Sequence, residues 1–181
     1  MTISLRTPLR VLFLIVWILT TSVSCAPAPS QLIALASFTE NYVQVSILLE
    51  REPAGDYVLS ATFTPPDGYH LYSKDIPLTG ANGLGRPTLL ELTSASRMES
   101  MGELVESLAA QEPDFEPKEL LVYPTGPVTL SLPVQLLSGD DWMDDELKIT
   151  YMACSAVQCK PPVVGKLVSI RVPGANVLDP P

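Results

Sequence analysis

The feature that most constrains the fold is a series of eight short apolar runs separated by proline and glycine. The runs are rich in Val, Ile, Leu, Thr and Tyr, which is the composition of β-strands. They cover residues 32–38, 42–49, 57–63, 69–72, 88–92, 128–137, 147–152 and 163–172. Most of the 18 prolines and ten glycines lie between the runs, where turns are expected. Eight strands at this spacing predict an all-β fold, an antiparallel β-sandwich.

Polar and apolar residues alternate most clearly in the run 42–49. There, Val43, Val45, Ile47 and Leu49 fall on one face, because successive side chains of a strand point to opposite sides. The alternation predicts a half-buried strand whose apolar face contacts the core.

Residues 96–111 have a different pattern and predict one short helical insertion. Met101, Leu104, Val105 and Leu108 recur at helical spacing, and serines just before them are available as an N-cap. Gly102 lies inside the segment and limits the length that we expect of the helix. We expect the apolar face of this helix to cover the sandwich; binding a partner is the alternative.

The first residues have the order of a secretory signal. Arg6 and Arg10 precede the apolar stretch 11–19, and small residues follow up to Cys25. The apolar stretch is too short to span a membrane. Residues 1–24 are therefore predicted to be a signal peptide.

Cys25 suggests how the signal ends. A cysteine directly after Ser24 resembles a bacterial lipoprotein signal, in which the cysteine is lipidated and becomes the first residue of the mature protein. Ser22 stands where that signal usually has an aliphatic residue. An ordinary secretory signal, cut near Ser24 or Ala28, is the alternative. A lipidated Cys25 would account for the odd member of the three cysteines.

The chain after the signal is long enough for one domain with a sizeable core. We expect a proline-containing flexible tether over 25–30, the sandwich domain over 31–172 and a mobile tail over 173–181.

Charge and composition argue against several kinds of partner and cofactor. Of the 11 basic residues two lie in the signal, which leaves nine against 20 acidic residues, and nucleic acid is therefore an unexpected partner. His70 is the single histidine and has no cysteine nearby in sequence, so we expect no metal and no other cofactor. The acidic run 139–146 lacks the ligand spacing of an EF-hand and is expected to form a solvated turn.

Cys154 and Cys159 are separated by four residues, at the end of one apolar run and just before the next. If the two runs are arms of an antiparallel hairpin, the sulfurs lie opposite each other within disulfide reach. Closing so short a loop stabilises a fold by only about 2 kcal/mol by chain entropy. A pair that closes easily and stabilises little suits reversible thiol chemistry; a static hairpin disulfide remains the alternative.

Two separated motifs resemble the amino-terminal periplasmic domain of the thiol:disulfide interchange protein DsbD family. They are Asp67-Gly-Tyr-His-Leu-Tyr-Ser-Lys74, followed by residues 76–79, and the cysteine motif 150–162. The intervening residues 122–134 are similar to the strand that links these motifs in the family. The resemblance covers roughly 41–172 and implies an immunoglobulin-like β-sandwich.

The resemblance also implies roles for the cysteines. Cys159 would be the more exposed sulfur, which forms mixed disulfides with partners, and Cys154 would be the resolving sulfur. Lys160, next to Cys159, would favour the thiolate, or would simply be solvated. The family has five residues between its cysteines, whereas this chain has four.

Aromatic side chains are expected to support the pair. In the family, aromatic residues of the Gly-Tyr-x-Leu-Tyr strand lie against the cysteines, which selects His70 and Tyr72 here. His70 replaces an aromatic hydroxyl of the family; it would either tune thiol acidity or simply be packed or exposed at the surface. Phe115 is the candidate for a cap that keeps wrong partners from the pair, with ordinary core packing as the alternative. Tyr151 is the aromatic residue that flanks the cysteine motif.

The resemblance implies an extracytoplasmic electron relay acting through Cys154 and Cys159. A thioredoxin-like domain or membrane electron transporter, on a separate chain, would supply electrons to exported disulfide or cytochrome-maturation proteins. The protein would then be a component of a protein-disulfide oxidoreductase in the periplasm or on the outer face of the membrane, held by the lipid on Cys25. The alternative is a noncatalytic immunoglobulin-like envelope binding module with a structural disulfide.

Overall fold

The computed structural model describes residues 31–178. The predicted signal peptide 1–24, the lipidation site Cys25, the tether up to residue 30 and the last three residues of the predicted tail lie outside the described residues.

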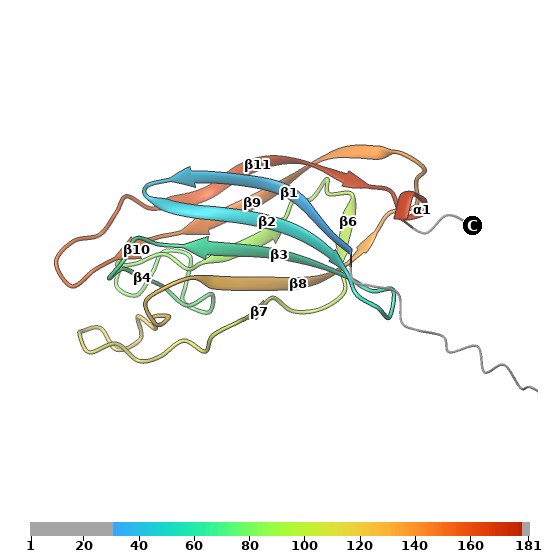
Figure 1. Ribbon diagram of the computed structural model, residues 1–181. Helices are drawn as coiled ribbons and strands as arrows, with labels where there is room; N and C mark the ends of the chain where they lie inside the picture. Colours follow the sequence, from blue (N-terminus) through green and yellow to red (C-terminus); the bar gives the residue numbers. More distant parts are fainter. Residues whose placement is uncertain (1–30, 179–181) are drawn as a thin grey trace, which may run out of the picture.

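Two antiparallel sheets pack face to face (Figure 1). The larger sheet has the order β1-β2-β3-β8-β6, with β7 also paired to β8, and its strands are β1 Gln31–Glu40, β2 Val43–Arg51, β3 Tyr57–Thr64, β6 Met98–Ser100, β7 Val105–Glu106 and β8 Val128–Leu136. The second sheet has the order β11-β9-β5 and consists of β5 Leu89–Leu92, β9 Trp142–Tyr151 and β11 Val163–Pro173. A two-stranded ladder joins β4 His70–Leu71 to β10 Ala153–Cys154 at one end of the sandwich. The antiparallel β-sandwich predicted from the sequence is confirmed.

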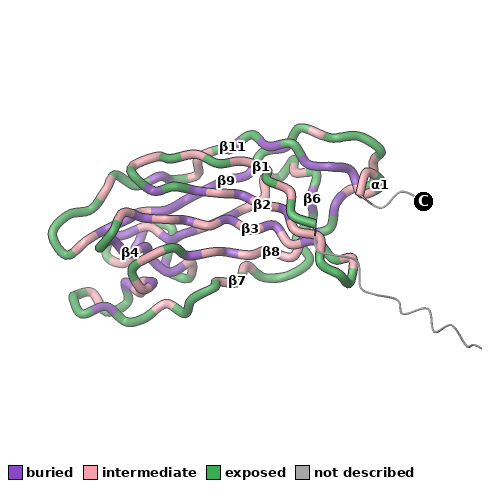
Figure 2. The backbone as a smooth tube through the Cα atoms, in the orientation of Figure 1, coloured by how far each residue is buried: buried purple, intermediate pink, exposed green. Residues whose placement is uncertain are grey.

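The core lies between the two sheets and is built by alternation along each strand (Figure 2). The inward residues of β2 are fully buried and are Val43, Val45, Ile47 and Leu49. On the opposite sheet, Leu147, Ile149 and Tyr151 of β9 are also completely buried. Burying an aliphatic side chain of this size contributes about 1.5–3 kcal/mol, so the period-two pattern stabilises the sandwich and sets its register.

Each of the eight predicted strands is present, with differences at the ends. Tyr42 was expected to start a strand but lies in the two-residue turn between β1 and β2. Asn41 and Tyr42 both have positive φ, of 49° and 67°, as a type I′ hairpin turn requires. Residues 142–146, expected in a solvated turn, instead belong to β9, because they pair with the end of β11.

The predicted helix over 96–111 is wrong. This segment contains β6 and β7, which pair with β8 on either side of Pro133. A proline lacks the backbone N–H that a continuous ladder needs, and the interruption between β6 and β7 lies opposite it. Met101 and Val105, which the helix would have placed on its apolar face, are exposed. Pairing with a strand distant in sequence therefore overrides the local helical spacing.

The segment expected to be a mobile tail is partly docked. β11 extends to Pro173, and a short helix, α1 Ala175–Leu178, follows it. The backbone N–H groups of Gly174 and Ala175 donate to the carbonyls of Asp141 and Leu137. A Cβ at Gly174 would lie 2.3 Å from the carbonyl oxygen of Gly139, so the turn leaves no room for a side chain there.

Candidate active site around the Cys154–Cys159 disulfide

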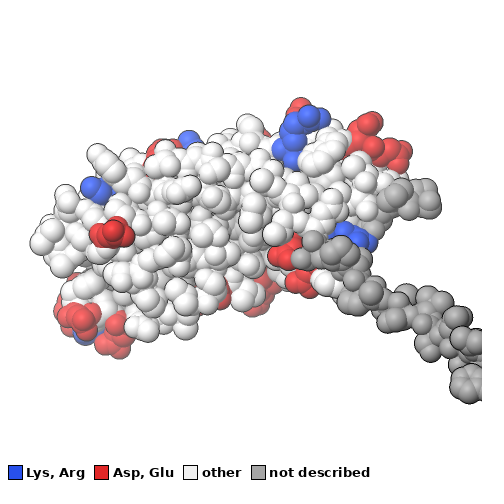
Figure 3. Space-filling view, in the orientation of Figure 1, with Lys and Arg blue, Asp and Glu red and all other residues white. Residues whose placement is uncertain are grey.

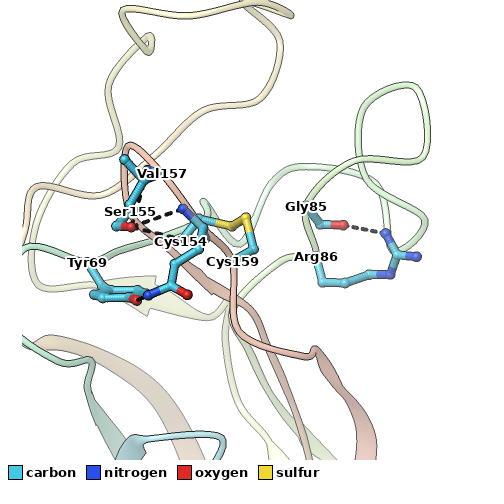
Figure 4. Close-up of a disulfide and its surroundings, with 8 residues drawn as sticks. Tyr69, Gly85, Arg86, Cys154, Ser155, Val157 and Cys159 are labelled. Carbon is cyan, nitrogen blue, oxygen red and sulfur yellow. Dashed lines mark hydrogen bonds between the residues drawn. A yellow bond between two sulfur atoms is a disulfide. The ribbon is translucent and has the colours of Figure 1, made fainter.

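Cys154 and Cys159 form a disulfide at the tip of the hairpin that joins β9 to β11 (Figure 4). The two residues face each other as an antiparallel bridge, with their Cα atoms 4.0 Å apart. Cross-strand pairing across a four-residue connection, expected from the sequence, is confirmed. The pairing of β9 with β11 continues below the disulfide and holds the two arms together.

Ser155 orders the connection between the cysteines. Its hydroxyl oxygen accepts hydrogen bonds from the backbone N–H groups of Val157 and Gln158, at 3.4 Å and 3.2 Å. Its own N–H donates to the carbonyl oxygen of Gln158 at 2.8 Å. The connection is thus a hydrogen-bonded turn that displays Val157, whose side chain is 89% exposed, at its tip.

The two bonded cysteines have very different surroundings. Cys154 is 2% exposed and packs in a small apolar cluster with Tyr72, Ile76 and Leu120. Cys159 is exposed. A partner in solution can therefore reach the sulfur of Cys159 far more easily than that of Cys154.

His70 lies directly opposite Cys154 in the ladder of β4 and β10. Directly opposed residues of an antiparallel pair place their Cβ atoms about 5 Å apart on the same face of the sheet. Tyr72 follows two residues later on that face and meets the His70 ring edge-on, with 5.4 Å between ring centroids. The prediction that residues 70 and 72 share a face is confirmed.

Phe115 stacks on the His70 ring. The two rings are stacked with 5.9 Å between their centroids and 26° between their planes. Phe115, Glu116, His70 and Tyr72 line a cavity of about 270 Å³ together with both cysteines. The structure therefore brings the segment around Phe115 to the disulfide, although it lies about 40 residues earlier in the sequence.

The segment that carries Phe115 is acidic. Its exposed carboxylates belong to Glu112, Asp114, Glu116 and Glu119. Figure 3 shows the acidic side chains gathered at this corner of the molecule, the lower left of the view, whereas the face of the large sheet is mostly uncharged. A partner that docks at the disulfide meets negative charge on this side.

Burial dominates the electrostatics of the two aromatic groups beside the disulfide. It lowers the pKa of the His70 imidazole below its ordinary value of 6.5, because the protonated ring loses hydration. It raises the pKa of the Tyr72 hydroxyl for the same reason. At neutral pH the imidazole and the phenol are both uncharged, and Glu116 is the one carboxylic acid among the residues that line the cavity.

Lys160 is not simply solvated. Its ammonium nitrogen lies 4.3 Å from the centroid of the Tyr42 ring and 5.2 Å from that of Tyr69. Its backbone N–H donates to the carbonyl oxygen of Ala153, which aligns the two arms of the hairpin. The cation is therefore held over two aromatic faces.

Tyr151, which the sequence pattern suggested as a supporting residue, belongs to the core. Its ring is completely buried and meets Phe63 edge-on at 5.7 Å. Its hydroxyl donates to the carbonyl oxygen of Glu40 at 3.0 Å, and burial raises the pKa of this hydroxyl. Tyr151 does not line the disulfide cavity. It faces the core because the odd-numbered residues of β9 point inward.

Several contacts of the hairpin were not predicted from the sequence. The amide of Gln158 donates to the Tyr69 hydroxyl at 2.7 Å, and the amide of Asn41 donates to the carbonyl oxygen of Pro161 at 2.9 Å. The turn between β1 and β2 and the residue just before β4 thus brace the cysteine hairpin. No local pattern marks these contacts, because each joins segments at least 89 residues apart.

The remaining wall of the cavity is the loop around Gly85. This residue has φ of 73°, and a Cβ there would lie 2.6 Å from the Leu120 side chain. The guanidinium of Arg86 donates to the carbonyl oxygens of Thr79, Gly83 and Gly85 and so holds the loop in shape (Figure 4). Glycine here lets the wall approach Tyr72 closely.

A larger groove of about 980 Å³ lies at the other end of the sandwich. It contains Trp142, Arg97 and Asp145 and no cysteine. The carboxylate of Asp145 in this groove is already hydrogen-bonded, because it accepts from the Ser96 hydroxyl and the Arg97 backbone N–H. We assign the active site to the smaller cavity because it contains the disulfide, the group with reactive chemistry.

Within residues 31–178 no cluster of His, Cys, Asp and Glu is arranged to hold a metal ion. The described residues also include no helix long and apolar enough to span a membrane.

No protein-family model matches the sequence, and no curated protein matches it. Among solved structures, the fold is similar to that of the N-terminal domain of DsbD from Neisseria meningitidis in the reduced form. The similarity covers 64% of this chain and 76% of that chain, with a TM-score of 0.41 and 20% sequence identity.

Proposed function

We propose that this protein exchanges thiols and disulfides with partner proteins through Cys154 and Cys159. The observation that carries the proposal is the asymmetry of the pair: an exposed sulfur at Cys159 is bonded to a buried sulfur at Cys154. A disulfide that closes a loop of this length stabilises the fold by only about 2 kcal/mol. β4 and the segment around Phe115 also bring His70, Tyr72 and Phe115 to the cavity of the disulfide, which a purely structural staple does not require.

The chemistry follows from the geometry. A partner thiolate attacks the sulfur of Cys159, which forms a mixed disulfide, and the electron pair of the broken bond stays on the sulfur of Cys154. A second partner thiolate then attacks the mixed disulfide and releases Cys159, so that the partner leaves oxidised and this protein is a dithiol. In the opposite direction, Cys159 attacks an acceptor disulfide and Cys154 resolves the intermediate.

The assignment of attacking and resolving roles rests on accessibility. Thiol–disulfide exchange requires three sulfurs nearly in line, so the partner must approach along the extension of the Cys154–Cys159 bond. Cys159 is exposed, whereas Cys154 is buried in an apolar cluster with Tyr72 and Leu120, and this contrast supports attack at Cys159. The turn held by Ser155 keeps the bond in this orientation.

Location and partners are part of the proposal. The signal-like start of the sequence and the resemblance to the DsbD family support an extracytoplasmic protein, lipid-anchored at Cys25. They also support a thioredoxin-like donor, on its own or within a membrane electron transporter, and exported disulfide or cytochrome-maturation proteins as acceptors. The protein would then act as one component of a protein-disulfide oxidoreductase.

The proposal is tested by trapping. The purified, reduced Cys154→Ala protein is mixed with a thioredoxin-like domain that keeps only its attacking cysteine, activated as a disulfide with thionitrobenzoate. Cys159 then displaces thionitrobenzoate, no second thiol reverses the reaction, and mixed disulfides are separated on a nonreducing gel. We expect a covalent complex with Cys154→Ala and none with Cys159→Ala, which is the matched control. In thioredoxin redox buffers the wild-type pair is expected to cycle. A pair that stays oxidised where thioredoxin is fully reduced, together with no complex, would contradict the proposal.

The same experiment separates the proposal from a noncatalytic binding module with a structural disulfide. Such a module predicts that Cys154→Ala and Cys159→Ala lower the free energy of unfolding equally and that neither forms a mixed disulfide.

A further inference from the structure

His70 is the single histidine of the chain, and the fold places it against the buried member of the cysteine pair. Cys154 has His70 opposite it on one side and Cys159 opposite it on the other. The side chains of directly opposed residues project to the same face of a sheet. The imidazole and the two sulfurs therefore form a row on the face that lines the cavity.

The imidazole has an unused polar atom. Nε2 of His70 is buried and has no hydrogen-bond partner among the described residues. An unpaired buried nitrogen is destabilising, so its presence beside the cysteine pair calls for an explanation. Stacking of Phe115 on one face and the edge contact with Tyr72 restrict the ring, and the imidazole cannot turn freely toward solvent.

Few other groups near His70 can exchange protons. Tyr72 directly follows β4 and contacts the His70 ring. Burial raises the pKa of its phenol. Glu116, from the segment that carries Phe115, lies at the rim of the cavity and is exposed. The cysteine hairpin lines the cavity with Met152, Ser155, Ala156 and the two cysteines, and it adds no carboxylate or amine there. Lys160 lies over Tyr42 and Tyr69 instead.

We propose that His70 is the acid–base partner of Cys154, the buried sulfur, and that its unpaired nitrogen takes up and returns the proton of that thiol during exchange. This inference rests on the proposed function, because it assigns a role within the same reaction.

The proton accounting is as follows. When a partner thiolate attacks Cys159, the Cys154–Cys159 bond breaks and Cys154 leaves as a thiolate with the bonding electron pair. The new negative charge raises the pKa of the adjacent imidazole, which takes a proton from water and forms an imidazolium–thiolate pair. The proton then passes to sulfur and leaves neutral His70 beside a Cys154 thiol.

The reverse reaction uses the same groups. When Cys154 resolves a mixed disulfide at Cys159, neutral Nε2 accepts the S–H proton and Cys154 attacks as a thiolate. The Cys154–Cys159 bond forms, the partner leaves with the electron pair of the broken bond, and the imidazolium returns its proton to water. Burial, which keeps the resting imidazole neutral, prepares it to act as this base.

The need for such a group is specific to Cys154. An isolated thiolate is costly in an apolar pocket, because burial penalises the charged form. Cys159 is exposed and water can stabilise its thiolate directly. His70 should therefore affect the step in which Cys154 attacks or leaves, and not the initial attack by Cys159.

The test separates these two steps with 5,5′-dithiobis(2-nitrobenzoate). The reduced protein releases a first thionitrobenzoate when Cys159 attacks the reagent, at a rate proportional to reagent concentration. Cys154 then closes the disulfide and releases a second thionitrobenzoate, at a rate independent of reagent concentration. Both releases are followed by absorbance for the wild type, His70→Gln and His70→Phe.

We expect the first release to be similar in all three proteins and the second to be slower in both variants, by on the order of 10²-fold near neutral pH. The wild-type second step should be nearly independent of pH between about pH 7 and pH 8, where His70 is neutral and the thiol is protonated. In both variants the rate of the second step should rise about tenfold per pH unit, because only the thiolate fraction of Cys154 reacts. His70→Phe fills the site with a ring that cannot titrate. If His70 acted only by packing, this variant would keep the pH profile of the wild type.

Equal second steps with the same pH profile in all three proteins would overturn the role of His70 while leaving the proposed exchange intact. A wild-type protein that releases no second thionitrobenzoate would overturn the proposed function instead.

A measurement on the wild type alone keeps the inference testable if a variant does not fold. The single histidine gives one imidazole Cε1–H signal in the NMR spectrum. In the dithiol form we expect this signal to report a second ionisation at alkaline pH, that of Cys154, which is missing from the disulfide form. A signal that titrates identically in the two forms would contradict the inference.

Discussion

Cys159 is exposed and Cys154, to which it is bonded, is 2% exposed, so a single disulfide joins the surface of the protein to an apolar cluster beneath it. This relationship supports the proposed division of roles, because a partner reaches the exposed end of the bond more easily than the buried end. In the proposed exchange, the buried sulfur must gain or lose a charge during each cycle. The residues around that sulfur, and not those around Cys159, are therefore expected to control the rate of resolution.

The first prediction concerns thiol accessibility in the reduced protein. Iodoacetamide should alkylate Cys159 roughly tenfold or more faster than Cys154, because a buried thiol ionises less and collides less with the reagent. Mass spectrometry of peptides after short reaction times measures the two rates. Equal labelling in a folded sample would contradict the assignment of Cys159 as the attacking sulfur.

The second prediction concerns Phe115 as a cover over the pair. Replacing Phe115 with Ala should accelerate reduction of the disulfide by dithiothreitol by about tenfold, equivalent to roughly 1.4 kcal/mol of barrier. Leu108→Ala is the matched control, since Leu108 and Phe115 are both 40% exposed and Leu108 does not line the cavity. The control should react at the wild-type rate. If both variants react alike, Phe115 is not a cover.

The third prediction concerns Lys160. Lys160→Gln should lower the free energy of unfolding by about 0.5–1 kcal/mol, because the cation leaves the faces of Tyr42 and Tyr69. Lys160→Arg should retain most of this stability, and urea unfolding measures both. The rate of the first thionitrobenzoate release should change by less than about threefold. A large loss of that rate without a loss of stability would instead assign the ammonium to the Cys159 thiolate.

The fourth prediction concerns Tyr151. Tyr151→Phe removes the hydrogen bond to the Glu40 carbonyl and should cost about 1 kcal/mol of stability. Exchange at the cysteine pair should be unchanged, because the ring stays in the core against Phe63. Unfolding and thionitrobenzoate release are measured on the same preparation. A slower exchange with unchanged stability would show that Tyr151 acts on the disulfide.

The fifth prediction concerns pH and stability. Burial lowers the pKa of His70 in the folded state below the 6.5 of the unfolded chain, so the unfolded chain binds more protons between these two values. The stability of the disulfide form is therefore full above pH 6.5 and decreases as pH falls through this window. Urea unfolding at several pH values measures the decrease. Above about pH 5 carboxylates do not yet titrate, so His70→Gln should remove the decrease in stability that the wild type shows between pH 6.5 and pH 5. An unchanged slope in His70→Gln would contradict burial of a neutral imidazole.

The strands were predictable because their signal is local. Alternation such as that from Val43 to Leu49 follows from the two-residue period of a strand, and the period holds wherever one face is buried. The cysteine pairing was predictable for the same reason, since four intervening residues suit a cross-strand bridge. The helix prediction for 96–111 was wrong because the apolar spacing of this segment fits a helix, whereas its structure depends on pairing with β8. The residues of the segment itself do not reveal that the edge of β8 is available.

The candidate site was predictable in part. His70 and Tyr72 were found from their shared face and the family resemblance, and Phe115 from the resemblance alone; all three line the cavity. Tyr151 was placed at the site because it flanks the cysteine motif in sequence, but neighbouring positions of a strand point to opposite sides. The contacts of Gln158 with Tyr69 and of Asn41 with Pro161 had no sequence signal, because they arise only when distant turns meet.

By itself, the sequence determined that this protein is built of antiparallel strands and that Cys154 and Cys159 can bond, since both properties depend on spacing along the chain. Only the tertiary structure decided that one sulfur is buried and the other exposed, and that the sole histidine lies against the buried one. Burial and contact between distant residues depend on how the sheets and loops pack together. That packing is the basis on which we propose an attacking sulfur, a resolving sulfur and a neighbouring base for this hairpin disulfide.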